Sequence, residues 1–271
     1  MAETMQGKKS RRVGDVPWLT PWVYGFMAFL YLPIAILILY SFNASSLAMV
    51  WSGFSLEWYA KVFSNADITH AAANSLIVAT IATVVASTLA TLAALVLVRG
   101  GKFKGRTASI TLISLPLMVP EIVTAVALLI VFAGAGISLG LGNVIIAHIM
   151  FCIPFAFMPI RARLEGMDTT LEQASADLYG SDWDTFRHVT LPILMPGILA
   201  GAMLAFVISL DDFIITMMVA GAGATTLPVY IYSMIRQGVT PEVNAVSSLL
   251  LAASLLLVTL YWLVTRKKND G

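Results

Sequence analysis

Long runs of apolar residues, separated by short polar stretches, make up most of this chain. A helix that spans a bilayer needs about 20 mostly apolar residues. Six runs meet that length: 20–42, 71–98, 108–133, 143–163, 194–219 and 244–265. The fourth contains Pro154 and Pro159, which membrane helices tolerate where neighbours satisfy the freed backbone groups. The pattern predicts an all-α membrane protein with six transmembrane helices.

The composition agrees with lipid as the main solvent. Hydrophobic residues form 59% of the 271 residues and charged residues 11%, whereas soluble domains carry about 25% charged residues. The single cysteine, Cys152, excludes a disulfide framework and a multi-cysteine metal site. The net charge of +1 gives no indication of a nucleic-acid partner.

The chain is expected to hold one membrane domain, residues 20–265, between a basic N-terminal segment, 1–19, and a tail, 266–271. The first apolar run follows a basic start, as in a signal peptide. It is longer than a signal-peptide core and no small-x-small cleavage site is obvious, so we expect an uncleaved first helix.

The basic residues are distributed very unevenly between the two sides of the predicted bundle. Only Lys61 and Arg236 fall on one side. The other 14 of the 16 lie in the alternate connections and at both ends: Lys8, Lys9, Arg11, Arg12, Arg99, Lys102, Lys104, Arg106, Arg161, Arg163, Arg187, Arg266, Lys267 and Lys268. Loops that face the cytoplasm carry an excess of Lys and Arg. Both termini are therefore expected in the cytoplasm.

The longest polar connection on that side is residues 164–194, here called the 164–194 loop. Thr169 and Glu172 have the spacing of a capping box, which predicts a helix start. Gly180 lies where a glycine C-cap is expected. The helix between them would place apolar and small residues on one face: Leu171, Ala174, Ser175 and Leu178.

A second helix is expected to begin at Ser181 with Asp184 and to end at Leu191-Pro192. The loop is thus predicted to be a helix–turn–helix. Its local pattern alone fits an exposed docking element and a plain, well-capped connector equally well.

The residues from Leu171 to Gly180, followed by Phe186 to Pro192, resemble the cytoplasmic "EAA" loop of ABC importer permeases. The motif's Glu-Ala-Ala is matched by Gln173-Ala174-Ser175, its glycine falls at Tyr179, and the spacing to Leu-Pro is kept. In that family the loop forms a coupling helix that docks into a groove of the ATPase subunit. The resemblance implies this role for Glu172, Gln173, Ala174, Ser175, Asp177, Leu178, Gly180, Leu191 and Pro192.

Further stretches resemble the putrescine and spermidine permeases of that family. They are Tyr40 to Asn43, Leu117 to Glu121, Ser209 to Phe213, Gly223 to Pro228 and Pro241 to Ala245. The Thr-Thr-Leu-Pro sequence within the fourth looks most like the putrescine permease. The resemblance covers about residues 20–265.

This resemblance implies a type I ABC importer permease fold in a bacterial inner membrane. It implies transport of a putrescine-like diamine from periplasm to cytoplasm by alternating access. The expected partners are a second permease subunit, a cytoplasmic ATPase dimer, a periplasmic polyamine-binding protein and membrane lipid. The chain itself would be no enzyme and would hold no cofactor, since the partner subunit uses the ATP.

Three acidic residues lie within apolar runs: Glu121, Asp211 and Asp212. An acid at the centre of a membrane helix costs roughly 2.5–3.5 kcal/mol, so it needs a cavity or a partner. No basic residue within the runs is expected to pair with them, which favours a cationic cargo. His148 is expected to form an interhelical hydrogen bond instead.

Asp211 and Asp212 are adjacent and point about 100° apart on a helix. One is therefore expected to face the pathway, and the other to pack on polar backbone or lie at a helix break. The resemblance favours Asp211, with Glu121, for the pathway. Two other interpretations stay open: the acids contact only a partner permease or an outer vestibule, or Glu121, after Pro120, only favours a helix start.

The chain lacks a Gly-x-x-x-x-Gly-Lys-Ser/Thr phosphate loop and a His-Glu-x-x-His zinc pattern. It is therefore not expected to hydrolyse ATP alone or to be an intramembrane metalloprotease. Two alternatives to the importer remain: a stand-alone secondary transporter for an organic cation, and an intramembrane aspartyl protease. The protease fits less well, since Asn143 follows Gly140-Leu-Gly142 where an aspartate would be needed. The 164–194 loop has a docking role only in the importer.

Overall fold

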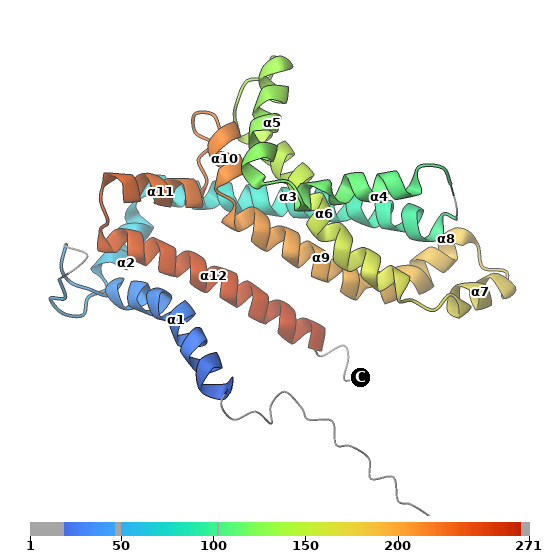
Figure 1. The fold of residues 1–271 in the computed structure, drawn as a ribbon, viewed down its shortest axis with the longest axis horizontal. Helices are drawn as coiled ribbons and strands as arrows, with labels where there is room; N and C mark the ends of the chain where they lie inside the picture. The colour runs from blue at the N-terminus through green and yellow to red at the C-terminus, as the bar shows by residue number, and fades with distance from the viewer. Residues whose placement is uncertain (1–18, 47–49, 102, 267–271) are drawn as a thin grey trace, which may run out of the picture.

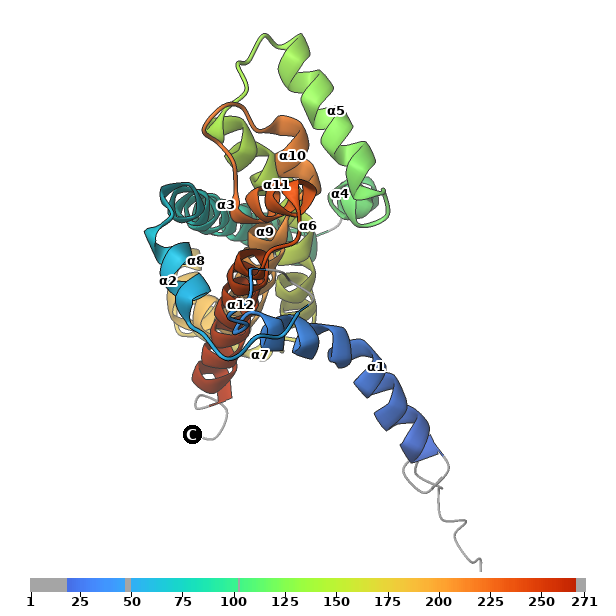
Figure 2. The ribbon, with the colours of Figure 1, turned by 90° about the vertical axis from the view of Figure 1, so that its left-hand side faces the viewer.

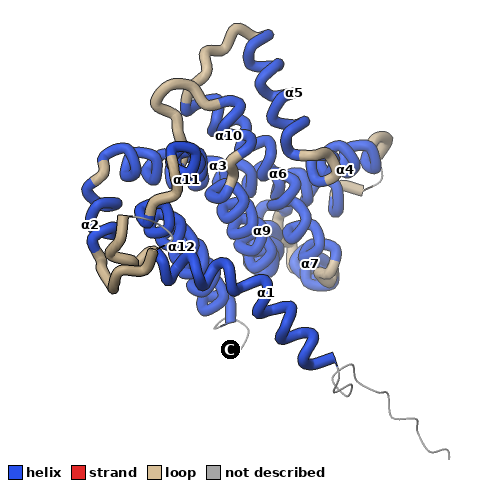
Figure 3. Tube along the Cα trace, turned by 60° about the vertical axis from the view of Figure 1, so that its left-hand side comes forward, coloured by secondary structure: helices blue, strands red, loops and turns tan. Residues whose placement is uncertain are grey.

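The structure, a computed structural model, describes residues 19–46, 50–101 and 103–266, and in these residues it has helices and no strands (Figure 3). Four long helices form the body: α3 (Ala66–Arg99), α6 (Leu141–Glu165), α9 (Leu191–Asp211) and α12 (Pro241–Arg266). They run roughly lengthwise through the molecule in Figure 1.

Helices α3, α6 and α9 pack directly on one another because small side chains line their contact. A stripe on α3, spaced by four residues, is fully buried: Ala82, Ala86, Ala90 and Ala94. Ala156 of α6 and Ala205 of α9 lie in the same buried cluster. A Cβ added at Gly201 of α9 would lie 2.5 Å from the carbonyl oxygen of Ala156. Small residues of this kind let membrane helices approach closely, where packing replaces the hydrophobic effect.

The third apolar run is broken. Helix α4 (Arg106–Ser114) passes through a 3₁₀ turn (Leu115–Leu117) and is followed by α5 (Glu121–Gly134) at an angle of 106°. The prediction of one continuous helix over 108–133 is therefore wrong. Pro116 lies in the 3₁₀ turn and Pro120 directly precedes α5. Each proline lacks an N–H and disfavours helical geometry in the residue before it, so the chain turns here.

The fifth run also differs from the prediction at both ends. The helix does not stop at Leu191-Pro192: α8 (Asp182–Thr185) continues through a π-helical turn (Phe186–Thr190) into α9. In that turn the Leu191 N–H donates to the Phe186 carbonyl, which is the i→i+5 bond of a π-helix. The helix therefore continues through Leu191 to Pro192. At the other end α9 stops at Asp211, and a short helix, α10 (Ile214–Val219), follows.

Helix α1 (Leu19–Tyr40) projects away from the body and is exposed over most of its length (Figure 2). Two short helices, α2 (Glu57–Ser64) and α11 (Leu227–Gln237), lie at the end of the molecule opposite α7 (Thr170–Asp177) and α8. Within the described ranges, five helices are long and apolar enough to cross a membrane, and the bent α4–α5 pair is a sixth when it is counted as one span. The prediction of an all-α protein with six spans is confirmed.

Several sequence predictions lie outside the described residues. They concern most of the segment 1–19, the tail after Arg266, and the basic residues Lys8, Lys9, Arg11, Arg12, Lys102, Lys267 and Lys268.

Candidate functional site

The three acidic residues singled out in the sequence line one open pocket of about 490 Å³. Glu121 comes from the first position of α5, Asp211 from the last position of α9, and Asp212 from the link to α10. Phe151 and Phe155 of α6 and Phe213 form much of the remaining wall, with Val207, Ile208 and Ile214. The break in each of the two spans therefore brings these carboxyl groups to one place.

The adjacent aspartates have different environments. Asp211 is exposed, whereas Asp212 is only 6% exposed. Asp212 Oδ1 accepts from the Ile215 N–H at 3.3 Å, and Oδ2 accepts from the Thr216 N–H at 3.0 Å. The prediction that one of the pair packs on polar backbone at a helix break is confirmed, with Asp212 in that position.

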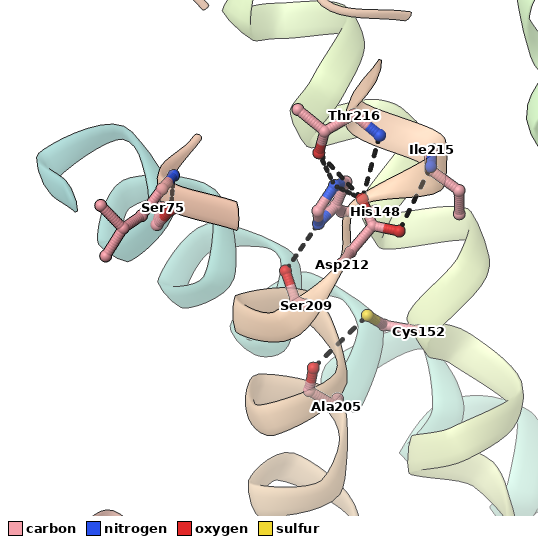
Figure 4. A network of polar contacts seen from close by, with 9 residues as sticks. Ser75, His148, Cys152, Ala205, Ser209, Asp212, Ile215 and Thr216 are labelled. Carbon is pink, nitrogen blue, oxygen red and sulfur yellow. Dashed lines mark hydrogen bonds and ion pairs between the residues drawn. The ribbon is translucent and has the colours of Figure 1, made fainter. Parts of the chain in front are cut away.

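Asp212 also has a partner that the sequence analysis missed. His148 Nε2 lies 3.1 Å from Asp212 Oδ2, and both side chains are almost completely buried (Figure 4). The expectation that no basic side chain within the spans pairs with the acids is therefore wrong for Asp212. A histidine within an apolar run is the sequence signal for such a pair, because its imidazole can donate to a buried carboxylate.

The predicted interhelical hydrogen bonding of His148 is confirmed. Its Nδ1 lies 2.7 Å from Ser209 Oγ on α9, and its Nε2 lies 2.9 Å from Thr216 Oγ1 on α10. One imidazole on α6 thus connects the two helices that flank the break (Figure 4).

Glu121 lies at the start of α5, half-buried, and its carboxyl group interacts with that of Asp212. Its position agrees with a carboxylate that favours a helix start, and the same position brings it into the pocket. Two neighbouring carboxylates repel each other, and either a proton on one of them or a nearby positive charge relieves the repulsion. The pocket is therefore suited to a cationic group.

The 164–194 loop is a helix–turn–helix, as predicted, but α7 begins differently. Thr169 makes no side-chain capping bond. Instead Asp168 Oδ1 accepts from the Thr170 N–H at 2.9 Å, which lowers the pKa of the Asp168 carboxyl. Glu172 does not reach back to the helix start, because its carboxylate binds Thr190 Oγ1 at 2.9 Å and approaches Arg99 Nε at 3.5 Å. The predicted capping box is therefore wrong.

The turn after α7 departs from the prediction by one residue. Tyr179, not Gly180, has the left-handed backbone conformation, with φ of +60°. Glycine is favoured at 180 for another reason: a Cβ there would lie 2.7 Å from Ser175 Oγ, because the turn brings the Gly180 N–H against the Ser175 carbonyl. The predicted restart at Ser181 is confirmed, since its Oγ accepts from the Asp184 N–H.

One face of this loop is apolar and uncovered. Leu178 is 81% exposed and Tyr179 98%, and Leu171, Ala174 and Trp183 are exposed as well. Ser175 belongs to the other side, because its hydroxyl bonds Thr185 Oγ1 at 2.8 Å. Gln173 and Asp177 are exposed, while Leu191 and Pro192 lie further on, at the start of α9.

The chain is similar in sequence to permeases of polyamine transport systems. The chain is 39% identical over 242 residues to the spermidine/putrescine transport system permease protein PotC of Haemophilus influenzae. That alignment covers 89% of this chain and 94% of the relative. It is 38% identical over 245 residues to the putrescine transport system permease protein PotI of Escherichia coli K12, which covers 86% of this chain and 87% of that protein.

Solved structures share the fold at lower identity. The bacterial ABC transporter that imports the acidic polysaccharide alginate superposes with a TM-score of 0.75 at 17% identity, over 93% of this chain and 94% of that one. Residues 86–267 match the family model for binding-protein-dependent transport system inner membrane components. The chain belongs to that family.

Proposed function

We propose that this chain is the membrane permease subunit of an ATP-driven importer for a polyamine of the putrescine type. The assignment of a cationic cargo rests on the pocket lined by Glu121, Asp211 and Asp212. An ammonium group that leaves water needs fixed negative charge in exchange, and aromatic faces add cation–π attraction. The pocket offers both, in carboxylates and in three phenylalanines.

The names of the relatives support the same cargo. Proteins 38–39% identical over most of this chain are permeases of spermidine/putrescine and putrescine transport systems. Two ammonium groups require more than one acid. Glu121 and Asp211 come from different spans and flank the buried Asp212, so they are the pair proposed to meet the cargo.

Energy coupling is proposed to run through the 164–194 loop. Its exposed apolar face, from Leu171 to Trp183, would dock into a groove of a separate ATPase dimer. A second permease subunit and a periplasmic binding protein would complete the importer. Closure of the ATPase dimer on ATP would then rock the spans between outward-facing and inward-facing states.

This arrangement requires both termini in the cytoplasm, together with the 164–194 loop. The basic residues support it, since 14 of the 16 lie on that side. A reporter fused after Gly271 should behave as cytoplasmic, and one inserted between residues 221 and 226 as periplasmic. Inverted signals would overturn this orientation.

The decisive experiment is uptake of labelled putrescine by the complete complex in proteoliposomes. Glu121→Gln and Asp211→Asn keep size and remove charge. Each should lower uptake roughly tenfold, the equivalent of one charge-assisted interaction. Asp212→Asn removes a carboxylate with several protein partners, so we expect its effect on folding to exceed that of the other two.

The matched control is Glu57→Gln, an exposed acid paired with Lys61 at 2.7 Å in α2, far from the pocket. It should leave uptake unchanged. Full uptake in both Glu121→Gln and Asp211→Asn would refute the cation pocket. Uptake that follows an ion gradient and ignores ATP would favour a secondary transporter instead.

A further inference from the structure

The bonds to Asp212 are concentrated on one of its oxygens. Oδ2 accepts from the Thr216 N–H at 3.0 Å and from Thr216 Oγ1 at 2.9 Å, and it faces His148 Nε2 at 3.1 Å. Oδ1 accepts the longer bond from Ile215, at 3.3 Å. The carboxylate is therefore held mainly through Oδ2.

The contacts of His148 fix where its proton lies. Thr216 Oγ1 donates its single proton to Asp212 Oδ2, so toward His148 it can only accept. Nε2 faces two acceptors, Thr216 Oγ1 and Asp212 Oδ2, and we assign a proton to it. Nδ1 is engaged by the Ser209 hydroxyl, so both ring nitrogens are fixed.

His148 lies behind the pocket. Asp212 is among the described residues that line it and His148 is not, and only 1% of His148 is exposed. The imidazole comes from α6, which α9 and α10 both contact, and it bonds one side chain on each. It therefore bridges the break between α9 and α10 at Asp212, one of the residues that line the pocket.

We infer that His148 is a positioning residue for transport: it holds the Asp212 carboxylate at the wall of the cargo pocket and keeps the α9–α10 break in one geometry. This inference rests on the proposed function, since the break that His148 and Asp212 hold also carries Asp211, one of the two acids proposed to meet the cargo. His148 would contribute to transport only through Asp212. A direct contact between His148 and the cargo is not part of it.

The test is a double-mutant cycle on putrescine uptake by the complete complex in proteoliposomes. His148→Leu removes the contacts of both ring nitrogens, and His148→Gln keeps an N–H donor near the Nε2 position. His148→Leu should lower the maximal uptake rate about tenfold, with unchanged half-saturation by the loaded binding protein. His148→Gln should recover most of the rate. In an Asp212→Asn background, His148→Leu should add less than a twofold change.

Ser209→Ala keeps the imidazole and removes only its Nδ1 partner, so the test does not depend on the folding of His148→Leu. It should lower uptake severalfold in the wild-type background and leave Asp212→Asn unaffected. Membrane insertion and unfolding temperature are measured for every variant, because a purely structural role would change these in proportion to uptake.

The outcomes separate the inference from the proposed function. The positioning role alone would be overturned if the unmutated complex takes up putrescine but the His148 and Asp212 changes act independently, so that their effects multiply. Equal loss in His148→Leu and His148→Gln would do the same. An intact wild-type complex that takes up no polyamine would overturn the proposed function, and with it this inference.

Discussion

Glu172 Oε2 lies 3.5 Å from Arg99 Nε, and this ion pair joins the first helix of the 164–194 loop to the last residue of α3. Arg99 also donates to the Met167 carbonyl at 3.3 Å, and Glu172 Oε1 accepts from Thr190 Oγ1 at 2.9 Å. The loop is thus fixed to the ends of two long helices. A force applied at the exposed face of α7 would be transmitted to α3 and α9 through these contacts.

Glu172→Gln should weaken that transmission. The two side chains are 25% and 21% exposed, so the ion pair contributes about 1 kcal/mol after solvent screening. We expect uptake by the complete complex to fall severalfold, while ATP hydrolysis falls less. The measurement is the ratio of putrescine molecules taken up to ATP molecules hydrolysed.

Glu165→Gln is the matched control. Glu165 pairs with Arg161 at 2.8 Å near the same end of the molecule, but on an exposed helix surface and within one helix. Its removal should leave the ratio unchanged. If the two glutamine variants gave the same ratio, Glu172 would have no special part in coupling.

The apolar face of α7 supplies a second prediction. Ala174 is exposed beside Leu171 and Leu178, on the face proposed to enter the ATPase groove. Ala174→Glu adds bulk and a charge that such a groove cannot accommodate. It should abolish co-purification of the ATPase and reduce uptake to background, while the chain still inserts into the membrane.

Ala176→Glu makes the same chemical change on the other side of α7. Ala176 lines an open pocket of about 650 Å³ next to Arg99, which has room for the longer side chain. ATPase binding should survive there. Loss of ATPase binding in Ala176→Glu, or its retention in Ala174→Glu, would contradict docking through the Leu171–Ala174–Leu178 face.

The sequence allowed more to be predicted about local patterns than about long-range pairing. Apolar runs gave the six spans, and the adjacency of Asp211 and Asp212 predicted that one of them lies at a break. His148 is 64 positions before Asp212, and no local pattern links them. Only the packing of α6 on α9 and α10 brings them to 3.1 Å.

The position of the helix break in the third apolar run could not be predicted from the sequence, for a different reason. Pro116 and Pro120 occur in the third apolar run, but prolines inside a span are compatible with a continuous helix, as Pro154 and Pro159 in α6 demonstrate. Whether a proline breaks a span depends on whether neighbouring helices satisfy the freed backbone groups. That information comes from tertiary packing.

Tyr179 gives a third prediction. Its left-handed backbone costs about 1 kcal/mol or more for a residue with a Cβ, whereas glycine adopts it freely. Tyr179→Gly should slow amide hydrogen exchange in α7 by stabilising the turn. Tyr179→Ala removes the same ring but keeps the strain, so it separates the backbone effect from any contact of the ring with the ATPase.

Gly180→Ala should act in the opposite direction. The new Cβ would lie 2.7 Å from Ser175 Oγ and 2.9 Å from the Ser175 carbonyl oxygen, so α7 must shift. Amide exchange in α7 should speed up. Faster exchange in Tyr179→Gly as well would show that the turn does not have the strained geometry described.

The last prediction concerns the contact of α6 with α9. Gly201 lets the two helices approach so closely that an alanine Cβ would lie 2.5 Å from the Ala156 carbonyl oxygen and 3.2 Å from its Cα. Backbone atoms cannot move aside as a flexible side chain would, so Gly201→Ala should destabilise the protein by about 1–3 kcal/mol.

Gly142→Ala is the control, because it is also helical and no atom beyond its own neighbourhood lies within 4 Å of the added Cβ. There the better helix propensity of alanine should leave stability unchanged or slightly raised. Thermal unfolding of the purified complex in detergent gives both values. Equal unfolding temperatures for the two variants would mean that α6 and α9 are further apart than the structure places them.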